Sequence, residues 1–582
     1  MTLAEKVHTW ITGDVDQDCQ EELSALLAAA HTDPAAQTEL EDRFHGRLQF
    51  GTAGLRGAMA AGPNRMNRAV VIAAARGLVD YLTASLKDQS RDGSVPGHVR
   101  QEGPGEIDTA SALAPKIVIG NDARHHSREF ALDTAGVVTA AGGQAFLLPD
   151  QTPTPVLAFA VRYLGADAGV MVTASHNPAA DNGYKVYLGG RMVADNERGV
   201  QIVPPYDADI SARIEAQPPA NQIERREGWT DCGPEVMEAY LAAITQGGAD
   251  LASPIRIVHT AMHGVGSVPA RRALSMTGFT DVVSVMAQAE PDPDFPTVSF
   301  PNPEEPGAID LALALAGEVE ADVVIANDPD ADRCAVAIPD PRRGWRMLHG
   351  DELGAVLADQ VGPRGVEGVL VNSVVSSRQL ELIAEEYGRG YVRTLTGFKW
   401  MGRVEGFAFA YEEAIGYCVR PDLVRDKDGL STAVAVARLV ARLKAEGRTI
   451  ASLLDDLARR HGLYLSSQLA VRFADLAQIP EVIAKLRAQP VESLAASPVV
   501  QTVDLAGGWG SLPPTEGILM LTAAADRVVI RPSGTEPKIK CYLEVIEPVS
   551  PDASFDDLSA HRTAAADRLT RIRSDLNDTV FA

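Results

Sequence analysis

The sequence of 582 residues has few cysteines, few aromatic residues and too little positive charge to balance its acids. The five cysteines are scattered and form no CxxC pair, which excludes a disulfide framework or a cysteine zinc site and is typical of a reducing cytoplasm. Aromatic residues make up only 5% of the chain, too few for a stacking platform that binds nucleic acid. The 53 basic and 78 acidic residues give a net charge of −25, and such a surface repels nucleic acid and anionic membranes.

Long apolar runs are also missing. No stretch approaches 18 uncharged apolar residues, so we expect no membrane span. The first residues are polar and acidic and lack the basic start and apolar core of a signal peptide. The 46% of hydrophobic residues can fill the cores of several domains. We therefore expect a cytoplasmic, multidomain protein that is a monomer or a dimer and acts on small molecules.

One pattern recurs four times along the chain. A short apolar, β-branched run ends in a polar loop with Gly or Pro, at residues 168–178, 321–333, 406–416 and 526–537. Ligands of α/β proteins gather where strands end and loops begin, and the intervals between these loops are domain-sized. The sequence therefore predicts four domains that share one site. The boundaries we expect are 1–218, 219–340, 341–462 and 463–582, with a helical extension at 1–48 and a loop insertion at 88–115.

The second loop, NDPDADR, alternates three aspartates: Asp328, Asp330 and Asp332. Carboxylates this close repel one another, and a hard divalent cation such as Mg²⁺ removes the repulsion. The alternative is a solvated acidic turn. The apolar strand before the cluster and Arg333 after it favour a metal site.

The first loop, TASHNP, exposes Ser175 next to His176 directly after a predicted strand. A serine needs a base or a metal to become a nucleophile, and Lys185, ten residues on, offers a nearby cation or proton donor. His176 could equally be structural. The GxSxG motif of serine hydrolases is absent.

The fourth loop, RPSGTEPKIK, collects the donors that a phosphate dianion prefers. They are the side chains of Arg531, Ser533, Thr535 and Lys538 with the backbone at Gly534. No GxxxxGK[ST] motif is present, which argues against a nucleotide kinase. The third loop carries Glu412 and Glu413, whose carboxylates can accept hydrogen bonds from sugar hydroxyls, although paired acids on a surface turn are common.

Together the four loops resemble those of the α-D-phosphohexomutase family. TASHNP is similar to its phosphoserine loop, DPDADR to its magnesium loop, EEAIG to its sugar-binding loop and RPSGTEP to its phosphate-binding loop, in the family order. Further resemblances are GTAGLRG (51–57), GNDARHHS (120–127), TGFKWMG (396–402) and DKDG (426–429). The resemblance covers nearly the whole chain beyond about residue 45.

The resemblance implies a four-domain, heart-shaped protein with three related α/β domains and a smaller α+β C-terminal domain. It implies that Ser175 carries the phosphoryl group and that Asp328, Asp330 and Asp332 hold Mg²⁺ together with a phosphoserine oxygen. Lys185 matches a lysine placed for proton transfer, and Arg56 and Arg333 match cations near the reacting phosphate. Lys399 and Gly397 belong to the TGFKWMG segment, which the resemblance associates with the sugar. The implied activity interconverts hexose 1-phosphate and hexose 6-phosphate through glucose 1,6-bisphosphate or an equivalent intermediate.

One departure affects the choice of substrate. Many family members carry Ser two residues after the sugar-loop Glu, whereas Glu413 is followed by Ala414 and Ile415. The EEAIG form resembles the phosphoglucomutase-2-like branch, which includes phosphopentomutase and glucose 1,6-bisphosphate synthase activities. Phosphomannomutase and phosphopentomutase therefore remain alternatives to phosphoglucomutase. A phosphatase lacks support because DPDADR does not match DxDx[TV], and a non-catalytic sugar-phosphate-binding regulator is the alternative from another class.

Overall fold

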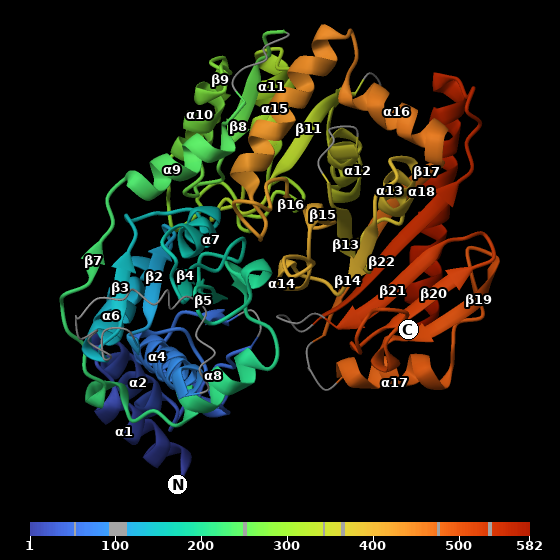
Figure 1. The fold of residues 1–582 in the computed structure, drawn as a ribbon. Helices are drawn as coiled ribbons and strands as arrows, with labels where there is room; N and C mark the ends of the chain where they lie inside the picture. Colours follow the sequence, from blue (N-terminus) through green and yellow to red (C-terminus); the bar gives the residue numbers. More distant parts are fainter. Residues whose placement is uncertain are drawn as a thin grey trace. The chain divides into compact units, whose positions relative to one another are not determined.

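The chain folds into two compact units, seen in the computed structural model of Figure 1. The first unit comprises Met1–Ala337 with Gly416–Arg438, and the second comprises Ile338–Ile415 with Leu439–Ala582. The structure describes residues 1–51, 54–91, 113–247, 253–340, 344–362, 367–473, 478–532 and 538–581. Within these residues the strands form four sheets.

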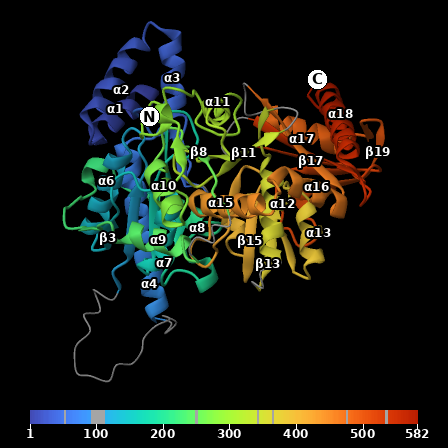
Figure 2. The same cartoon turned by 90° about the horizontal axis from the view of Figure 1, so that it is seen from above.

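The N-terminal residues of the first unit form three helices that pack against one another (Figure 2). They are α1 (Leu3–Gly13), α2 (Gln17–Ala29) and α3 (Pro34–Phe44). Helix α1 begins with a capping box in which Thr2 and Glu5 satisfy each other's backbone N–H groups. The side chains of Asp16 and Asp33 cap α2 and α3, because each accepts a hydrogen bond from backbone N–H groups in the first turn of its helix. The small core of this layer contains Val7, Leu23 and Leu40.

A seven-stranded sheet follows, with the order β1-β5-β4-β2-β3-β7 and with β6 paired to β5. Its strands are β1 (Leu55–Ala58), β2 (Lys116–Asn121), β3 (Gln144–Leu147), β4 (Ala168–Val172), β5 (Asp181–Leu188), β6 (Val200–Gln201) and β7 (Thr230–Asp231). Its helices are α4 (Arg68–Arg91), α6 (Ser127–Ala140), α7 (Thr154–Tyr163) and α8 (Tyr206–Glu215). Strands β3, β2 and β4 are parallel, whereas β5 runs antiparallel to β4.

Both faces of this sheet are covered, as the alternation of side chains in β2 shows. Ile117 and Ile119 belong to the core on the side of α4, α6 and α8, whereas Val118 belongs to the core on the side of α7. All five residues of β4 are buried. A strand buried on both faces reads as a continuous apolar run, which is why AGVMV could be predicted from the sequence.

The remaining part of the first unit contains four neighbouring strands of a five-stranded sheet, in the order β11-β10-β8-β9. Strands β8 (Ile257–Thr260), β9 (Val282–Ser284) and β10 (Val323–Ala326) are parallel neighbours, and β11 (Ala335–Asp340) is antiparallel to β10. The helices here are α9 (Glu235–Ile244), α10 (Ser267–Met276) and α11 (Asp310–Glu318). Strand β16 (Gly416–Cys418) and the start of α15 (Gly429–Ala445) complete the unit.

The second unit contains a parallel sheet and an antiparallel sheet. In the first, β13 (Val369–Ser373) lies between β14 (Tyr391–Thr394) and β15 (Phe407–Glu412), beside α12 (Gly350–Val361), α13 (Gln379–Glu386) and α14 (Phe398–Met401). The second sheet has the order β17-β22-β21-β20-β19-β18. Its strands are β17 (Leu463–Arg472), β18 (Ser493–Leu494), β19 (Ser497–Asp504), β20 (Ile518–Thr522), β21 (Arg527–Pro532) and β22 (Lys538–Glu547). Strand β12 (Gly344–Met347) and helices α16 (Ile450–His461), α17 (Gln478–Ala488) and α18 (Phe555–Thr579) are also present, and α18 packs along β17 and β22 (Figure 1).

Two expectations need correction at helix α4. The helix continues to Arg91, so residues 88–91 of the predicted insertion are helical, and residues 92–112 lie outside the described part of the chain. By length and composition α4 could also cross a membrane, which the sequence analysis did not expect. Its apolar residues, however, pack against α6 and α8 in the core of the first sheet, as those of a core helix do.

A cavity-forming substitution tests the role of α4. Leu82 is fully buried in this core, so Leu82→Ala should lower the free energy of unfolding by about 2–5 kcal/mol. We expect the melting temperature to fall by several degrees in thermal unfolding followed by circular dichroism. Lys87→Ala, an exposed position on the same helix, is the control and should change stability by less than about 0.5 kcal/mol. Equal stability of the two variants would mean that α4 is not packed as described.

Candidate active site

The serine loop begins where the central strand β4 ends. Ser175 is only 3% exposed, which corrects the expectation of an exposed serine, because its hydroxyl donates a hydrogen bond of 2.9 Å to Oδ2 of the buried Asp328. Nδ1 of His176 lies 3.2 Å from the same hydroxyl. The backbone N–H of Ser175 donates to the hydroxyl of Thr173 at 2.8 Å. The structure thus brings the predicted serine and the predicted acidic cluster into direct contact.

Arg124 holds this loop in place, a role that the sequence analysis did not assign. The residue is 4% exposed, and its guanidinium donates to the carbonyls of Ser175 at 2.7 Å and Asn177 at 2.5 Å. It also donates to the carbonyls of Pro178 at 2.7 Å and Asp181 at 3.1 Å. Four carbonyls on one planar guanidinium fix the shape of the loop. The signal in the sequence was the GNDARHHS segment, which carries Arg124.

Three buried carboxylates form the centre of the site. Asp328, Asp330 and Asp332 are each 0% exposed, and one oxygen of each lies within 4.8 Å of the others. Burial, followed by the charges of Asp330 and Asp332, raises the pKa of Asp328 well above its ordinary value. Oδ1 of Asp330 and Oδ1 of Asp332 are buried without a hydrogen-bond donor in the described residues.

Lys185 on β5 supplies much of the positive charge that faces the cluster. Its ammonium donates to Oδ2 of Asp330 at 2.8 Å and to Oδ2 of Asp332 at 3.0 Å. Burial alone would raise the pKa of Asp330, but the charge and hydrogen bond of Lys185 outweigh it and hold that pKa below its ordinary value. Burial would lower the pKa of Lys185, but the charges of Asp330 and Asp332 outweigh it and raise that pKa. In this arrangement Lys185 is a protonated donor.

The backbone is strained in both loops that form the contact between Ser175 and Asp328. Ser175 has φ 53° and Ala331 has φ 57°, in the left-handed region that side chains rarely adopt. Such strain is held by the surrounding structure and concentrates at functional sites. The aspartate loop also needs Gly264, because a Cβ at that position would lie 2.3 Å from the Cα of Pro329. The loops therefore keep their shape against a local energetic cost.

Other cations and hydroxyls surround the cluster. The guanidinium of Arg56 on β1 donates to Oδ1 of Asn177 at 3.3 Å, and the backbone N–H of Arg333 donates to Oδ1 of Asp328 at 2.9 Å. Two neighbours were not assigned from the sequence. The hydroxyl of Thr154 donates to Oδ2 of Asp330 at 2.7 Å, and the ammonium of Lys427 lies 3.4 Å from Oδ2 of Asp332. Lys427 belongs to the DKDG segment, so the motif was a usable signal for it.

The second unit contains the other predicted site residues. Glu412 ends β15, and Glu413 follows it and is 6% exposed. Gly397 precedes the short helix α14 and has φ 102°, and Lys399 lies within that helix. A Cβ at Gly350 would lie 1.8 Å from the carbonyl oxygen of Glu413, so only glycine allows the start of α12 to approach this loop.

The predicted phosphate loop is described only at its two ends. Arg531 is part of β21, and its guanidinium donates to the hydroxyl of Thr396, which precedes the TGFKWMG glycine. Lys538 begins β22 and pairs in register with Arg472. Ser533, Gly534 and Thr535 lie outside the described residues. Through Arg531, one described end of the predicted phosphate loop therefore contacts the segment that carries Gly397 and Lys399.

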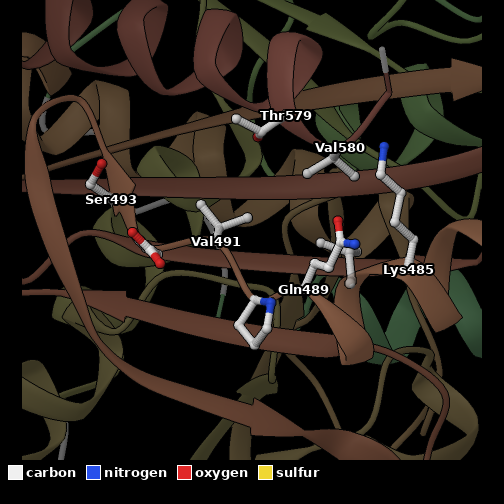
Figure 3. Close-up of a pocket in the computed structure, with 9 residues that line it drawn as sticks. Lys485, Gln489, Val491, Ser493, Thr579 and Val580 are labelled. Atoms are coloured by element: carbon white, nitrogen blue, oxygen red, sulfur yellow. The ribbon is translucent and has the colours of Figure 1, made fainter.

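The acidic cluster fits a metal ion. Carboxylate oxygens are the ligands of hard divalent cations, and two of the oxygens here lack a donor. A bound cation would satisfy these oxygens and remove the repulsion that raises the pKa of Asp328. A different hollow, of about 390 Å³, lies among α17, β18 and the end of α18 (Figure 3). Lys485, Gln489 and Ser493 line it, and it belongs to the unit that does not contain Ser175.

These features are those of a multidomain α/β phosphotransferase in which a serine faces an acidic cluster that could hold a metal ion. Family models for the phosphoglucomutase/phosphomannomutase α/β/α domains I, II and III match residues 100–218, 238–342 and 349–461, and the C-terminal domain model matches residues 469–549. The chain belongs to the phosphoglucomutase/phosphomannomutase family of α-D-phosphohexomutases and has its four-domain α/β architecture. It is therefore an enzyme, a phosphohexomutase of the intramolecular phosphotransferase group.

Similar proteins differ in the sugar that their names give. A probable phosphomannomutase from Haemophilus influenzae is 42% identical over 82% of this chain and 93% of its own length. A probable phosphoribomutase from Schizosaccharomyces pombe is 33% identical over 93% of both chains. A solved phosphoglucomutase/phosphomannomutase family protein from Burkholderia thailandensis has a TM-score of 0.65 at 20% identity and covers 92% of this chain and 98% of its own. Other relatives are named phosphoglucomutase and glucose 1,6-bisphosphate synthase.

Removing one charge from the cluster tests the metal site. We expect metal-free Asp328→Asn to be as stable as the wild type or more stable, because the raised pKa of Asp328 means that ionising it opposes folding. The contribution of protonated Asp328 to the stability of the wild type is fully present below the ordinary carboxyl pKa. That contribution is lost as the pH rises through the raised pKa of Asp328. The advantage of the variant should therefore grow with pH. Mg²⁺ should stabilise the wild type, by about 2.7 kcal/mol at 100 times its Kd, and should not stabilise the variant.

Thermal unfolding of both proteins with EDTA and with Mg²⁺, at several pH values, measures these effects. Asp195→Asn is the matched control, since Asp195 is 82% exposed and pairs only at the surface with Arg198. Its response to Mg²⁺ should equal that of the wild type. Equal Mg²⁺ stabilisation of Asp328→Asn and the wild type would contradict a metal site at this cluster.

Proposed function

We propose that the enzyme interconverts hexose 1-phosphate and hexose 6-phosphate, in the manner of a phosphoglucomutase, through a phosphoserine at Ser175. The observation that supports this most directly is the 2.9 Å hydrogen bond between the Ser175 hydroxyl and the buried Asp328. A phosphoryl group on that oxygen would adjoin the carboxylates and Lys185. Phosphoryl transfer needs positioning and charge neutralisation more than covalent chemistry from the protein, and this arrangement offers both.

Mg²⁺ is the cofactor that we assign to Asp328, Asp330 and Asp332, with an oxygen of phosphoserine 175 as a further ligand. When bound, the ion spreads the negative charge of the phosphoryl group and stabilises the departing serine oxygen. The orphaned oxygens of Asp330 and Asp332 support the assignment. Arg56 and Arg333 add positive charge near the reacting phosphoryl group.

The substrate's own phosphate is bound by Arg531, Ser533, Gly534, Thr535 and Lys538. Glu412, Glu413, Gly397 and Lys399 bind the sugar. The hydrogen bond between Arg531 and Thr396 supports a joint role for the phosphate loop and the TGFKWMG segment. Charged donors without strong directionality suit a loop that must hold either phosphate of a bisphosphate in turn.

The reaction consists of two phosphoryl transfers, and the proton released in the first is taken up in the second. In the first, the bond between phosphorus and the Ser175 oxygen breaks, a bond forms to the free sugar hydroxyl, and the hydroxyl proton leaves to a base. The product is a sugar 1,6-bisphosphate, such as glucose 1,6-bisphosphate, which also serves as activator. It turns around and returns its other phosphoryl group to Ser175, while the proton returns to the leaving sugar oxygen.

Lys185 is the candidate for proton transfer, with Lys399 as a second candidate for proton transfer or sugar contact. The raised pKa of Lys185 in the metal-free site makes it a donor, which suits the second transfer directly. Acting as a base in the first transfer requires that positive charge at the carboxylates lower this pKa. The 3.2 Å contact of His176 with the serine hydroxyl supports its place near the reacting oxygen.

Mannose and pentose phosphates are the alternative substrates, and the names of the relatives support each of them. A regulator that binds sugar phosphate without turnover is the alternative from another class. We assign the domains to residues 1–218, 219–340, 341–462 and 463–582, and the ranges of the family models support this division. Cytoplasmic localisation and a monomeric or dimeric state stay predictions.

A coupled assay tests the proposal. With Mg²⁺ and a trace of the matching bisphosphate, the wild type should convert glucose 1-phosphate to glucose 6-phosphate. Ser175→Ala should lose at least about 10³-fold in kcat, because it removes the group that carries the phosphoryl. Ser24→Ala, a substitution in the N-terminal helix α2, is the control.

Relative rates on mannose 1-phosphate and ribose 1-phosphate then give the substrate preference. A higher kcat/KM on either would replace glucose as the substrate while leaving the mechanism in place. Full activity in Ser175→Ala would exclude the phosphoserine. Binding of all three sugar phosphates without turnover would favour the regulator.

A further inference from the structure

The sugar-loop glutamate is held by two serines from a neighbouring strand. The hydroxyl of Ser376 donates to Oε2 of Glu413 at 2.9 Å, and that of Ser373 donates to the same oxygen at 3.3 Å. The backbone N–H of Glu413 donates to the hydroxyl of Ser376 at 3.3 Å. The two serine hydroxyls are themselves 2.8 Å apart. The Ser376 hydroxyl thus contacts both the backbone and the side chain of Glu413.

The two serines supply hydroxyl groups that the sugar loop itself, residues 412–416, does not contain. Glu413 is followed by Ala414 and Ile415, neither of which can orient a carboxylate. Ile415 has φ 52°, a strained conformation for a β-branched side chain, and it is 1% exposed. The loop shape is therefore imposed by its surroundings. Both serines bind the same oxygen, Oε2, and so orient the carboxylate of Glu413.

The serines belong to the 373–376 turn, which consists of Ser373, Val374, Val375 and Ser376 at the end of β13. A fully buried arginine on β21 binds this turn. The guanidinium of Arg527 donates to the carbonyl of Val374 at 3.1 Å, that of Val375 at 3.1 Å and that of Ser376 at 2.7 Å. Four residues after Arg527, the same strand carries Arg531.

Apolar and ionic contacts support the arginine. Val374 and Val375 pack in one buried cluster with Val529 of β21 and Tyr542 of β22. The carboxylate of Glu544, on β22, lies 3.7 Å from Arg527. Glu544 is in turn fixed by Arg378, two residues beyond the turn, through a 2.5 Å contact with the guanidinium. Nε of Arg527 has no hydrogen-bond partner among the described residues, but both terminal nitrogens of the guanidinium bind carbonyls of the turn and so orient it.

We propose that Ser376 is a positioning residue for Glu413 and that Arg527 sets the 373–376 turn on which Ser376 lies. Contacts through this turn thereby link the sugar-binding carboxylate to β21, the strand that leads to the phosphate loop. Arg527 touches neither sugar nor phosphate and acts through the turn. The inference rests on the proposed function, in which Glu413 binds the sugar.

The test separates positioning from simple loss of stability by a double-mutant cycle in the full-length enzyme. Ser376→Ala should raise the KM for the sugar phosphate about 10-fold and lower kcat by less than about 3-fold, because it loosens binding rather than chemistry. Ser376→Thr, which keeps the hydroxyl, should restore KM to within about 3-fold of the wild type. Ser467→Ala is the control, since Ser467 is half-buried on β17 of the same unit and lies outside the contacts of Glu413 and Arg527.

The cycle uses Glu413→Gln as the second substitution. If Ser376 acts through Glu413, Ser376→Ala should have no further effect on KM in the Glu413→Gln background. Arg527→Lys should behave in the same way, because one ammonium cannot replace a guanidinium that binds three carbonyls. Melting temperatures of all variants show which of them fold, and Arg527→Lys is chosen because it keeps a cation at the buried position.

Each outcome decides the question. Non-additive effects with rescue by Ser376→Thr support the positioning role. A wild type that is active, together with additive effects or with an equal KM change in Ser467→Ala, overturns the inference and leaves the proposed function intact. A wild type without mutase activity on glucose, mannose and ribose phosphates overturns both.

Discussion

The candidate site is built around three carboxylates in a space that excludes water. Charges of one sign repel strongly where the dielectric is low, and the protein compensates them only in part. Lys185 binds two of the three aspartates, and Oδ1 of Asp330 and Oδ1 of Asp332 still lack a donor in the described residues. This incomplete compensation distinguishes a cation site from a structural ion-pair network. The hydroxyl of Ser175 supplies one further hydrogen-bond donor to this cluster, at Oδ2 of Asp328.

The same constraint accounts for the scaffold around the cluster. Placing Ser175 against Asp328 requires left-handed backbone at Ser175 and Ala331, which costs of order 1–3 kcal/mol at each position. The four carbonyl hydrogen bonds of Arg124 and the close approach allowed by Gly264 hold these loops against that cost. These contacts maintain a left-handed backbone at Ser175 and Ala331 that the local sequence alone would not adopt.

Patterns in the sequence predicted the individual strands and loops, but they did not predict most contacts between residues that are far apart in the sequence. The four strands that precede the loops, at 168–172, 323–326, 407–412 and 527–532, were predictable because buried strands are continuous apolar runs. The contact of Ser175 with Asp328, across 153 residues, followed only from the family resemblance. Thr154 reaches Asp330 across 176 residues and Arg527 reaches Val374 across 153, and no periodicity connects such pairs. The left-handed backbone of Ile415 was equally invisible, since its side chain disfavours that conformation.

A mutase must recognise two orientations of one bisphosphate, so the same sugar and phosphate contacts are used in both transfers. On the proposed roles, the 373–376 turn links these contacts: it carries the hydroxyls that hold Glu413 and is itself bound by β21, the strand that carries Arg531. A shift of this turn would therefore move the carboxylate together with its contacts to that strand. Substrate preference in this chain would then depend on the buried turn as much as on the residues that touch the sugar.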